Sequence, residues 1–132
     1  MSDPQPVKPA IWFRSLFVGG SIGPGKLALL RLIADTGSVS GAARALRMSH
    51  ARSVKLVAEI NALSARPLVE TRSGGESGGG ATLSEDARLL LADYRAMQDD
   101  IARIARPHLI RIADRLAERS HSGQALGSGK AT

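Results

Sequence analysis

Two closely spaced helix starts constrain the fold of this chain more than any other feature. Ser40 and Ser49 each precede a run rich in Ala and Arg, and Ser is favoured just before a helix because its hydroxyl accepts a backbone N–H of the first turn. The first run contains an Ala-Ala pair at residues 42–43. The spacing predicts a short helix that ends near Leu46. A second helix is predicted to start after Ser49 and to end near Leu63, which makes the pair a helix-turn-helix.

This segment is strongly basic. Between Ser40 and Val57 there is no Asp or Glu, and the net charge of +6 lies mostly in the first part of the chain: residues 1–83 hold ten Lys/Arg against five acids, whereas residues 84–119 hold seven of each. A compact unit with positive charge on one side favours the phosphate backbone of DNA. We therefore expect double-stranded DNA as the partner. The cations of the segment are Arg44, Arg47, Arg52 and Lys55.

The predicted second helix has a small, basic outer face over its first turns. Such a face suits the major groove, because bulky side chains would block the approach to base edges. We expect His50, Arg52 and Lys55 to contact base edges. Arg44 and Arg47 are expected to contact phosphates and set the register, and Ser49 to cap the helix and contact phosphate. The predicted DNA-binding residues are Ser49, His50, Ala51, Arg52, Ser53, Lys55, Arg44, Arg47 and Arg72.

The elements before the helix-turn-helix are predicted to be a strand and a helix. Ile11–Val18 is apolar and indicates a short strand, and residues 19–23 indicate a turn. Pro24 suits a first helical turn, so we expect a helix over Pro24–Thr36 that ends at Gly37. Its predicted core face consists of Leu27, Leu30, Ile33 and Ala34.

The segment Gly20–Lys26 fits the phosphate-binding pattern G-x-x-x-x-G-K. Leu27 follows where a nucleotide site needs a hydroxyl for Mg²⁺, and Pro24 removes one backbone N–H from the loop. We therefore do not expect a nucleotide site here.

A glycine-rich hairpin and a long helix are predicted after the helix-turn-helix. Residues 67–72 and 81–83 indicate two strands joined by a glycine-rich loop, the wing of a winged helix. A final helix starts at Ser84, is ended or kinked by Pro107, and reaches about Arg119. Its apolar stripe favours a dimer seam, although packing onto its own domain is the alternative. The predicted dimer-interface residues are Leu90, Tyr94, Met97, Ile101 and Ile104.

Several stretches together resemble the N-terminal DNA-binding domain of ModE, a molybdate-responsive bacterial repressor family, over about residues 11–106. LysR-type regulators share the helix-turn-helix part. The resemblance implies a dimeric winged helix that acts as a repressor, with molybdate-related genes as candidate targets. This chain departs from the family at His50 and Val54, where aromatic residues are familiar. The matching stretches are Asp35–Ser40, Ala42-Ala43, Met48-Ser49, Glu59–Asn61, Pro67–Val69, the glycine-rich wing and Leu83-Ser84.

Other classes of function are not expected. The three His lie on three predicted elements without ligand spacing, so we predict no catalytic residues, metal or cofactor, and no enzyme. Full-length ModE continues into molybdate-binding domains, whereas this chain stops at Thr132, so we expect no molybdate sensing within it. The chain has no Cys, residues 1–10 lack the apolar run of a signal peptide, and no stretch approaches the ~20 apolar residues of a membrane span. We expect a soluble cytoplasmic protein.

The expected fold class is mainly α with a small β-wing, a winged helix-turn-helix followed by a long C-terminal dimerisation helix. The function expected is that of a sequence-specific, dimeric DNA-binding transcriptional regulator. A non-specific architectural DNA-binding protein is the alternative, and a module that docks a protein partner is a third class. The expected organisation is a flexible arm over 1–10, the winged domain over 11–83, the long helix over 84–119 and a disordered tail over 120–132.

Overall fold

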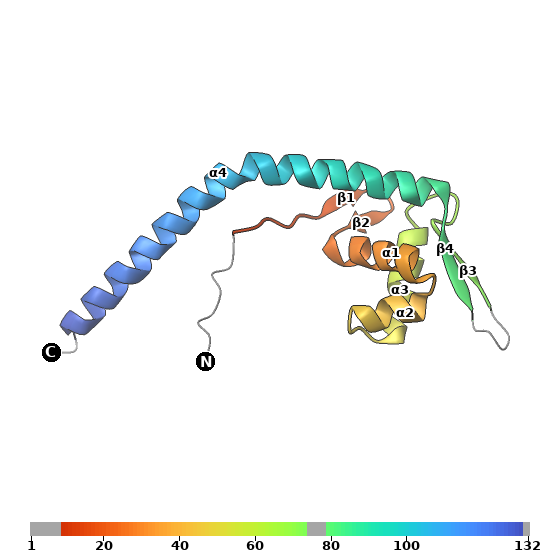
Figure 1. Cartoon of the computed structure of the whole chain (residues 1–132), viewed down its shortest axis with the longest axis horizontal. Coiled ribbons are helices and arrows are strands. Elements are labelled where there is room, and N and C mark those ends of the chain that lie inside the picture. The colour runs from red at the N-terminus through yellow and green to blue at the C-terminus, as the bar shows by residue number, and fades with distance from the viewer. Residues whose placement is uncertain (1–8, 74–78, 131–132) are drawn as a thin grey trace. The chain divides into compact units, whose positions relative to one another are not determined.

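A computed structural model describes residues 9–73 and 79–130 of the chain, with side chains as far as residue 118 in the last helix. Most of the predicted arm and the tip of the predicted wing lie outside these residues. The described chain is mainly helical with two short hairpins, a winged helix-turn-helix followed by a long helix (Figure 1), and the predicted fold class is confirmed. The elements are β1 (Ser15–Phe17), β2 (Gly20–Ile22), α1 (Pro24–Thr36), α2 (Val39–Ala45), α3 (His50–Asn61), β3 (Val69–Arg72), β4 (Gly80–Leu83) and α4 (Glu85–Lys130).

Contacts divide the chain into two units. Residues Trp12–Ala96, which we call the head, form one unit, and the described residues from Met97 onward form the other together with residues 9–11. The head contains both hairpins, α1 to α3 and the first turns of α4. It therefore extends beyond the predicted boundary at residue 83, because Ala87 of α4 is fully buried in the head's core.

Helix α1 has the predicted bounds. Pro24 occupies its first turn, and Gly37 ends it in the left-handed region (φ 71°), with its N–H donating to the carbonyl of Ile33 at 2.8 Å. The predicted core face is only partly right, since Ala34 is exposed whereas Leu29 is fully buried. The reason is tertiary: α1 contacts α2, α3 and β4 together, so more than one stripe of the helix is covered.

The cap of α2 differs from the prediction. Ser38, not Ser40, precedes the helix with an extended backbone, and its Oγ accepts the N–H of Gly41 at 2.9 Å. Gly37 ends α1 directly before Ser38, so the chain enters α2 without a longer loop. Ser40 lies inside the helix and is exposed.

The start of α3 is confirmed and its end is earlier than predicted. The Ser49 hydroxyl accepts the N–H of Arg52 at 3.1 Å, so Ser49 caps α3 as expected. The helix ends at Asn61, two residues before the predicted end near Leu63, and the Asn61 side chain binds the backbone that leads into β3.

The predicted leading strand is one half of a hairpin whose second strand was not predicted. Strands β1 and β2 pair antiparallel, with Phe17 opposite Gly20, so Val18 and Gly19 form a two-residue loop. The predicted turn over residues 19–23 is therefore mostly strand. Gly20 has φ 149°, which a residue with a side chain rarely adopts and which lets the chain reverse at this point.

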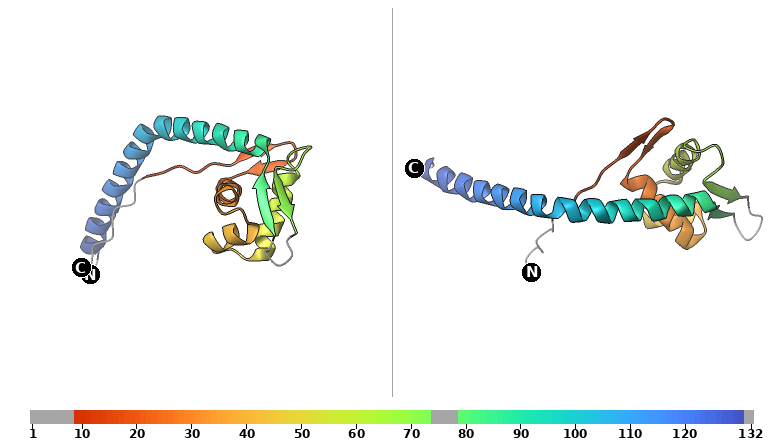
Figure 2. Two further views of the ribbon diagram at one scale, coloured as in Figure 1. Left: turned by 45° about the vertical axis from the view of Figure 1, so that its right-hand side comes forward. Right: turned by 90° about the horizontal axis from the view of Figure 1, so that it is seen from above.

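The predicted wing is confirmed as the hairpin of β3 and β4, with Val69 opposite Leu83 and Arg72 opposite Gly80. Figure 2 shows the two hairpins as separate two-stranded ribbons. One backbone hydrogen bond joins the wing to the turn after α1, since the Ala81 N–H donates to the carbonyl of Gly37 at 2.9 Å. The Ser84 N–H donates to the carbonyl of Leu68, also at 2.9 Å, and extends the β3–β4 pairing by one residue pair.

Helix α4 starts as predicted, with the Ser84 Oγ accepting the N–H of Ala87 at 3.1 Å. It runs through Pro107 and its helical backbone reaches Lys130, past the predicted end near Arg119. Over the described residues, no helix is both long and apolar enough to span a membrane.

Candidate nucleic-acid interface

The first turns of α3 present the basic face that the sequence predicts. His50, Ala51, Arg52 and Lys55 are all exposed, and Val54 between them is half exposed. The opposite face of α3 packs into the core through side chains such as Ile60, which is 1% exposed. The buried face holds the helix in place while its first turns stay accessible.

Ser53 is a wrong prediction among the DNA-binding residues. It is fully buried, and its hydroxyl donates to the carbonyl of His50 at 2.6 Å. The helical wheel places Ser53 on the same side as Leu56 and Val57, and the structure keeps it there. Its hydroxyl is used inside the first turn of α3, so it has no surface to offer to DNA.

The turn between α2 and α3 contains Arg47 in an unusual backbone conformation. Arg47 has φ 55° and is the one residue other than glycine with positive φ among those described. Its N–H donates to the carbonyl of Arg44, and the N–H of Met48 donates to that of Ala43 at 3.0 Å. This tight turn leaves Arg44 and Arg47 exposed, as a phosphate-contacting role requires.

The wing is attached to α3 by a residue that the sequence analysis did not single out. The half-buried Asn61 accepts the N–H groups of Leu68 and Val69, both at 2.9 Å, and donates to the carbonyl of Val69 at 3.1 Å. Arg72 is exposed on β3, beside Gly80. An Asn at the end of an amphipathic helix, followed closely by a strand, is the sequence signal that could have found this contact.

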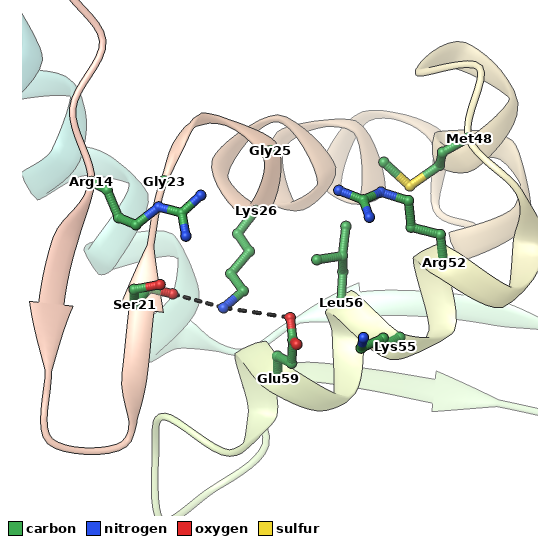
Figure 3. A pocket seen from close by; sticks show the side chains of 10 residues that line it. All are labelled: Arg14, Ser21, Gly23, Gly25, Lys26, Met48, Arg52, Lys55, Leu56 and Glu59. Carbon is green, nitrogen blue, oxygen red and sulfur yellow. Dashed lines mark hydrogen bonds and ion pairs between the residues drawn. The ribbon is translucent and has the colours of Figure 1, made fainter.

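Arg14 and Lys26 are also basic residues beside α3 that the prediction missed. They line a pocket of about 330 Å³ in the head together with Arg52 and Lys55 of α3, and Figure 3 shows Arg14 and Arg52 extending toward it from opposite sides. Lys26 donates to the carbonyl of Ser21 at 2.8 Å and lies 3.6 Å from a carboxylate oxygen of Glu59. The basic surface is therefore wider than the helix-turn-helix alone.

The residues of the predicted dimer stripe differ in exposure along α4. Tyr94 is 5% exposed and stacks on Phe13, with ring centroids 6.5 Å apart, so its assignment to a dimer interface is wrong. Leu90 packs against the core of the head. Ile104, which lies beyond the head, is 64% exposed. Ile112 and Leu116, farther along α4, are also exposed apolar residues. Met97 and Ile101 are half-buried.

Known proteins share this winged helix-turn-helix. The chain is 37% identical over 86 residues to the molybdenum-pterin-binding protein MopB of Rhodobacter capsulatus, covering 65% of this chain and 32% of MopB. It is also 37% identical over 71 residues to the DNA-binding transcriptional dual regulator ModE of Escherichia coli K12, covering 54% of this chain and 27% of ModE. The chain is homologous to the ModE proteins. The predicted resemblance is thus confirmed.

The ModE homologue spans only about a third of the length of the curated relatives it matches. No protein-family model matches it. Among solved structures, the full-length LysR-type regulator LysG from Corynebacterium glutamicum with bound effector Arg has a TM-score of 0.50 and 27% identity, over 74% of this chain and 30% of LysG. Its likeness agrees with a winged helix-turn-helix followed by a long helix.

Proposed function

We propose that this ModE homologue is a sequence-specific, DNA-binding transcriptional regulator. The observation that carries the proposal is the first half of α3, where a capped helix start exposes Ala51 between the two polar side chains His50 and Arg52. A helix end that is narrow and positively charged can enter the major groove and reach base edges. Similarity to ModE of Escherichia coli K12, a DNA-binding transcriptional dual regulator, supports the same function.

The exposed residues divide by role. Arg52, Lys55 and His50 contact base edges, because they belong to the first turns of the recognition helix. Arg44 and Arg47 contact phosphates from the preceding turn, and Ser49 offers the N-terminal end of α3 to a phosphate. Arg72, on strand β3 of the wing, contacts the DNA backbone.

We also propose that the protein binds as a homodimer through α4 beyond the head. Ile104, Ile112 and Leu116 are each more than half exposed there, and a helix with exposed apolar side chains gains free energy by pairing with a second copy. Two heads placed about 34 Å apart would read a pseudo-palindromic site.

The test begins with duplexes enriched from a random-sequence pool by the purified protein. Fluorescence anisotropy then compares an enriched duplex with a scrambled one, for the wild type and for Arg52→Ala and Lys55→Ala. We expect each variant to lose about 1–3 kcal/mol of discrimination between the two duplexes. Arg95→Ala on α4 is the matched control, since it removes an exposed cation outside the proposed interface.

Two outcomes would contradict this function. Equal affinity of the wild type for both duplexes, with a steep salt dependence, would identify a non-specific architectural DNA-binding protein. Binding to neither duplex would leave the winged helix as a module that docks a protein partner.

We propose that the regulator represses transcription and that its target genes are related to molybdenum. A head that occupies a promoter excludes other proteins from it, and MopB is named for binding a molybdenum-pterin. Genome-wide mapping of bound DNA, with transcript levels measured in cells with and without the gene, tests both points. Bound sites away from molybdenum-related genes, or transcripts that fall when the gene is deleted, would contradict the proposal.

A further inference from the structure

A pocket beside α3 gathers four basic side chains. Its volume is about 330 Å³, and four cations face one carboxylate, that of Glu59. The segment with the G-x-x-x-x-G-K pattern forms one wall, since Ser21, Gly23, Gly25 and Lys26 all line it. The pattern therefore lines a pocket. The four cations are Arg14, Lys26, Arg52 and Lys55.

Most of this positive charge is not neutralised within the described chain. Only Lys26 has an ion pair, with Glu59 at 3.6 Å, and the side chain of Glu59 is 43% exposed. Within residues 9–73 and 79–130, the structure shows no hydrogen bond or ion pair to the side chains of Arg14, Arg52 and Lys55. Three guanidinium or ammonium groups thus share one hollow with a single, partly solvated carboxylate.

Gly23 leaves room for the Arg14 side chain at the wall of the pocket. A side chain at Gly23 would meet the Nε of Arg14 at 3.3 Å, so the absence of one lets the Arg14 side chain lie across the wall. At Gly25 an added Cβ would meet nothing within 4 Å. Figure 3 shows that the side chains of Arg14 and Lys26 approach from the β1–β2 hairpin and α1, and those of Arg52 and Lys55 from α3.

We propose that this pocket binds a phosphate-like oxyanion. A tetrahedral oxyanion offers several acceptor oxygens to donors from different directions, and charge-assisted hydrogen bonds to Arg and Lys are the strong ones. Either a DNA backbone phosphate or a free inorganic anion supplies this chemistry. Its coupling to DNA through Arg52 and Lys55 rests on the proposed function, whereas anion binding itself does not.

The first experiment needs no DNA. Inorganic phosphate is titrated into the full-length protein in a chloride buffer of constant ionic strength, and backbone amide shifts are followed by NMR. We expect saturable shifts at Gly25, Lys26 and Arg52. Arg14→Ala should weaken the binding about tenfold, since it removes a charge-assisted contact, and Arg95→Ala should leave it unchanged.

A second pair of variants separates the charge of the pocket from its shape. Gly25→Glu and Gly25→Gln introduce side chains of equal size at a position with free space. A carboxylate in the first turn of α1 is compatible with the helix, so both variants should fold. Gly25→Glu places a negative charge among the cations and should abolish phosphate binding, whereas Gly25→Gln should retain part of it.

DNA affinity in phosphate-free buffer then identifies the source of the anion. If a DNA phosphate occupies the pocket, Arg14→Ala lowers affinity for all sequences alike and reduces the salt slope by about one. If a free anion occupies it, Arg14→Ala leaves DNA affinity unchanged, and added phosphate weakens DNA binding of the wild type only.

The proposal is overturned if phosphate causes no saturable shifts around the pocket, or if Arg14→Ala and Gly25→Glu leave those shifts unchanged, whatever the DNA result. Phosphate binding by a protein that binds no DNA would support the pocket and contradict only the proposed function.

Discussion

Asn61 holds Val69 at both of its backbone polar groups. Its Oδ1 accepts the Val69 N–H at 2.9 Å, and its Nδ2 donates to the Val69 carbonyl at 3.1 Å. Asn61 is the last residue of α3 and Val69 is the first of β3, so one carboxamide connects α3 to the wing. This side chain adds to the backbone hydrogen bond from Ala81 to Gly37, which also holds the wing to the head.

Replacing Asn61 should loosen this connection. Asn61→Ala leaves the N–H groups of Leu68 and Val69 without their acceptor, and we expect a loss of about 1–3 kcal/mol in the free energy of unfolding, measured by urea denaturation. Asn61→Asp keeps an acceptor for both N–H groups but places a carboxylate oxygen against the Val69 carbonyl, so it should lose stability as well. An Asn61→Ala variant as stable as the wild type would show that these side-chain contacts contribute nothing.

Arg47 offers a test that separates stability from DNA binding. Its φ of 55° is unfavourable for a residue with a side chain and free of strain for glycine. We expect Arg47→Gly to raise the free energy of unfolding by about 1 kcal/mol relative to Arg47→Ala, as measured by thermal and urea unfolding.

Both Arg47 variants lose the same charge, so both should bind DNA more weakly to the same extent and with a smaller salt slope. Equal stability of Arg47→Gly and Arg47→Ala would argue against strain in the turn. Unchanged DNA affinity of both variants would show that Arg47 does not contact DNA.

The cap of α3 should contribute to folding and to DNA binding in separable ways. Ser49→Ala removes the acceptor of the Arg52 N–H and should cost about 1 kcal/mol of stability. Ser49→Asp keeps a capping oxygen, so its stability should stay near that of the wild type. Its negative charge should nevertheless repel phosphate, and anisotropy should show weaker DNA binding than for Ser49→Ala. If Ser49→Asp bound DNA more tightly than Ser49→Ala, Ser49 would not lie beside a DNA phosphate.

The proposed dimer depends on the exposed stripe of α4. The Ile104 side chain is 64% exposed in the single chain, and Ile104→Glu would place a carboxylate in the proposed apolar interface. We expect this variant to sediment as a monomer in sedimentation velocity experiments. Ala102→Glu, two residues earlier and therefore on another side of the helix, is the matched control and should stay dimeric. A wild-type protein that sediments as a monomer at all concentrations would contradict the dimer.

Local signals in the sequence were enough for several elements. Pro24 and Gly37 set the bounds of α1, Ser49 set the start of α3, and the glycine-rich stretch between two apolar runs located the wing. These features act over one helical turn or one hairpin, where the capping hydroxyl, the left-handed glycine and the missing N–H of proline are properties of the residue itself. The resemblance to ModE could likewise be found from the printed sequence, since it rests on short stretches of residues.

The tertiary structure decided how those elements share their surfaces. Ser53 and Tyr94, which were predicted to contact DNA and a second copy, are buried. On α1, Ala34 is exposed although it was predicted in the core face, whereas Leu29, outside that predicted face, is fully buried. The tertiary structure also brought Arg14 and Lys26 to the side of α3, although they lie far from Arg52 and Lys55 in the chain. Periodicity shows which residues share a face of one helix, but burial depends on what other elements cover that face, and only the packing of the whole head determines this.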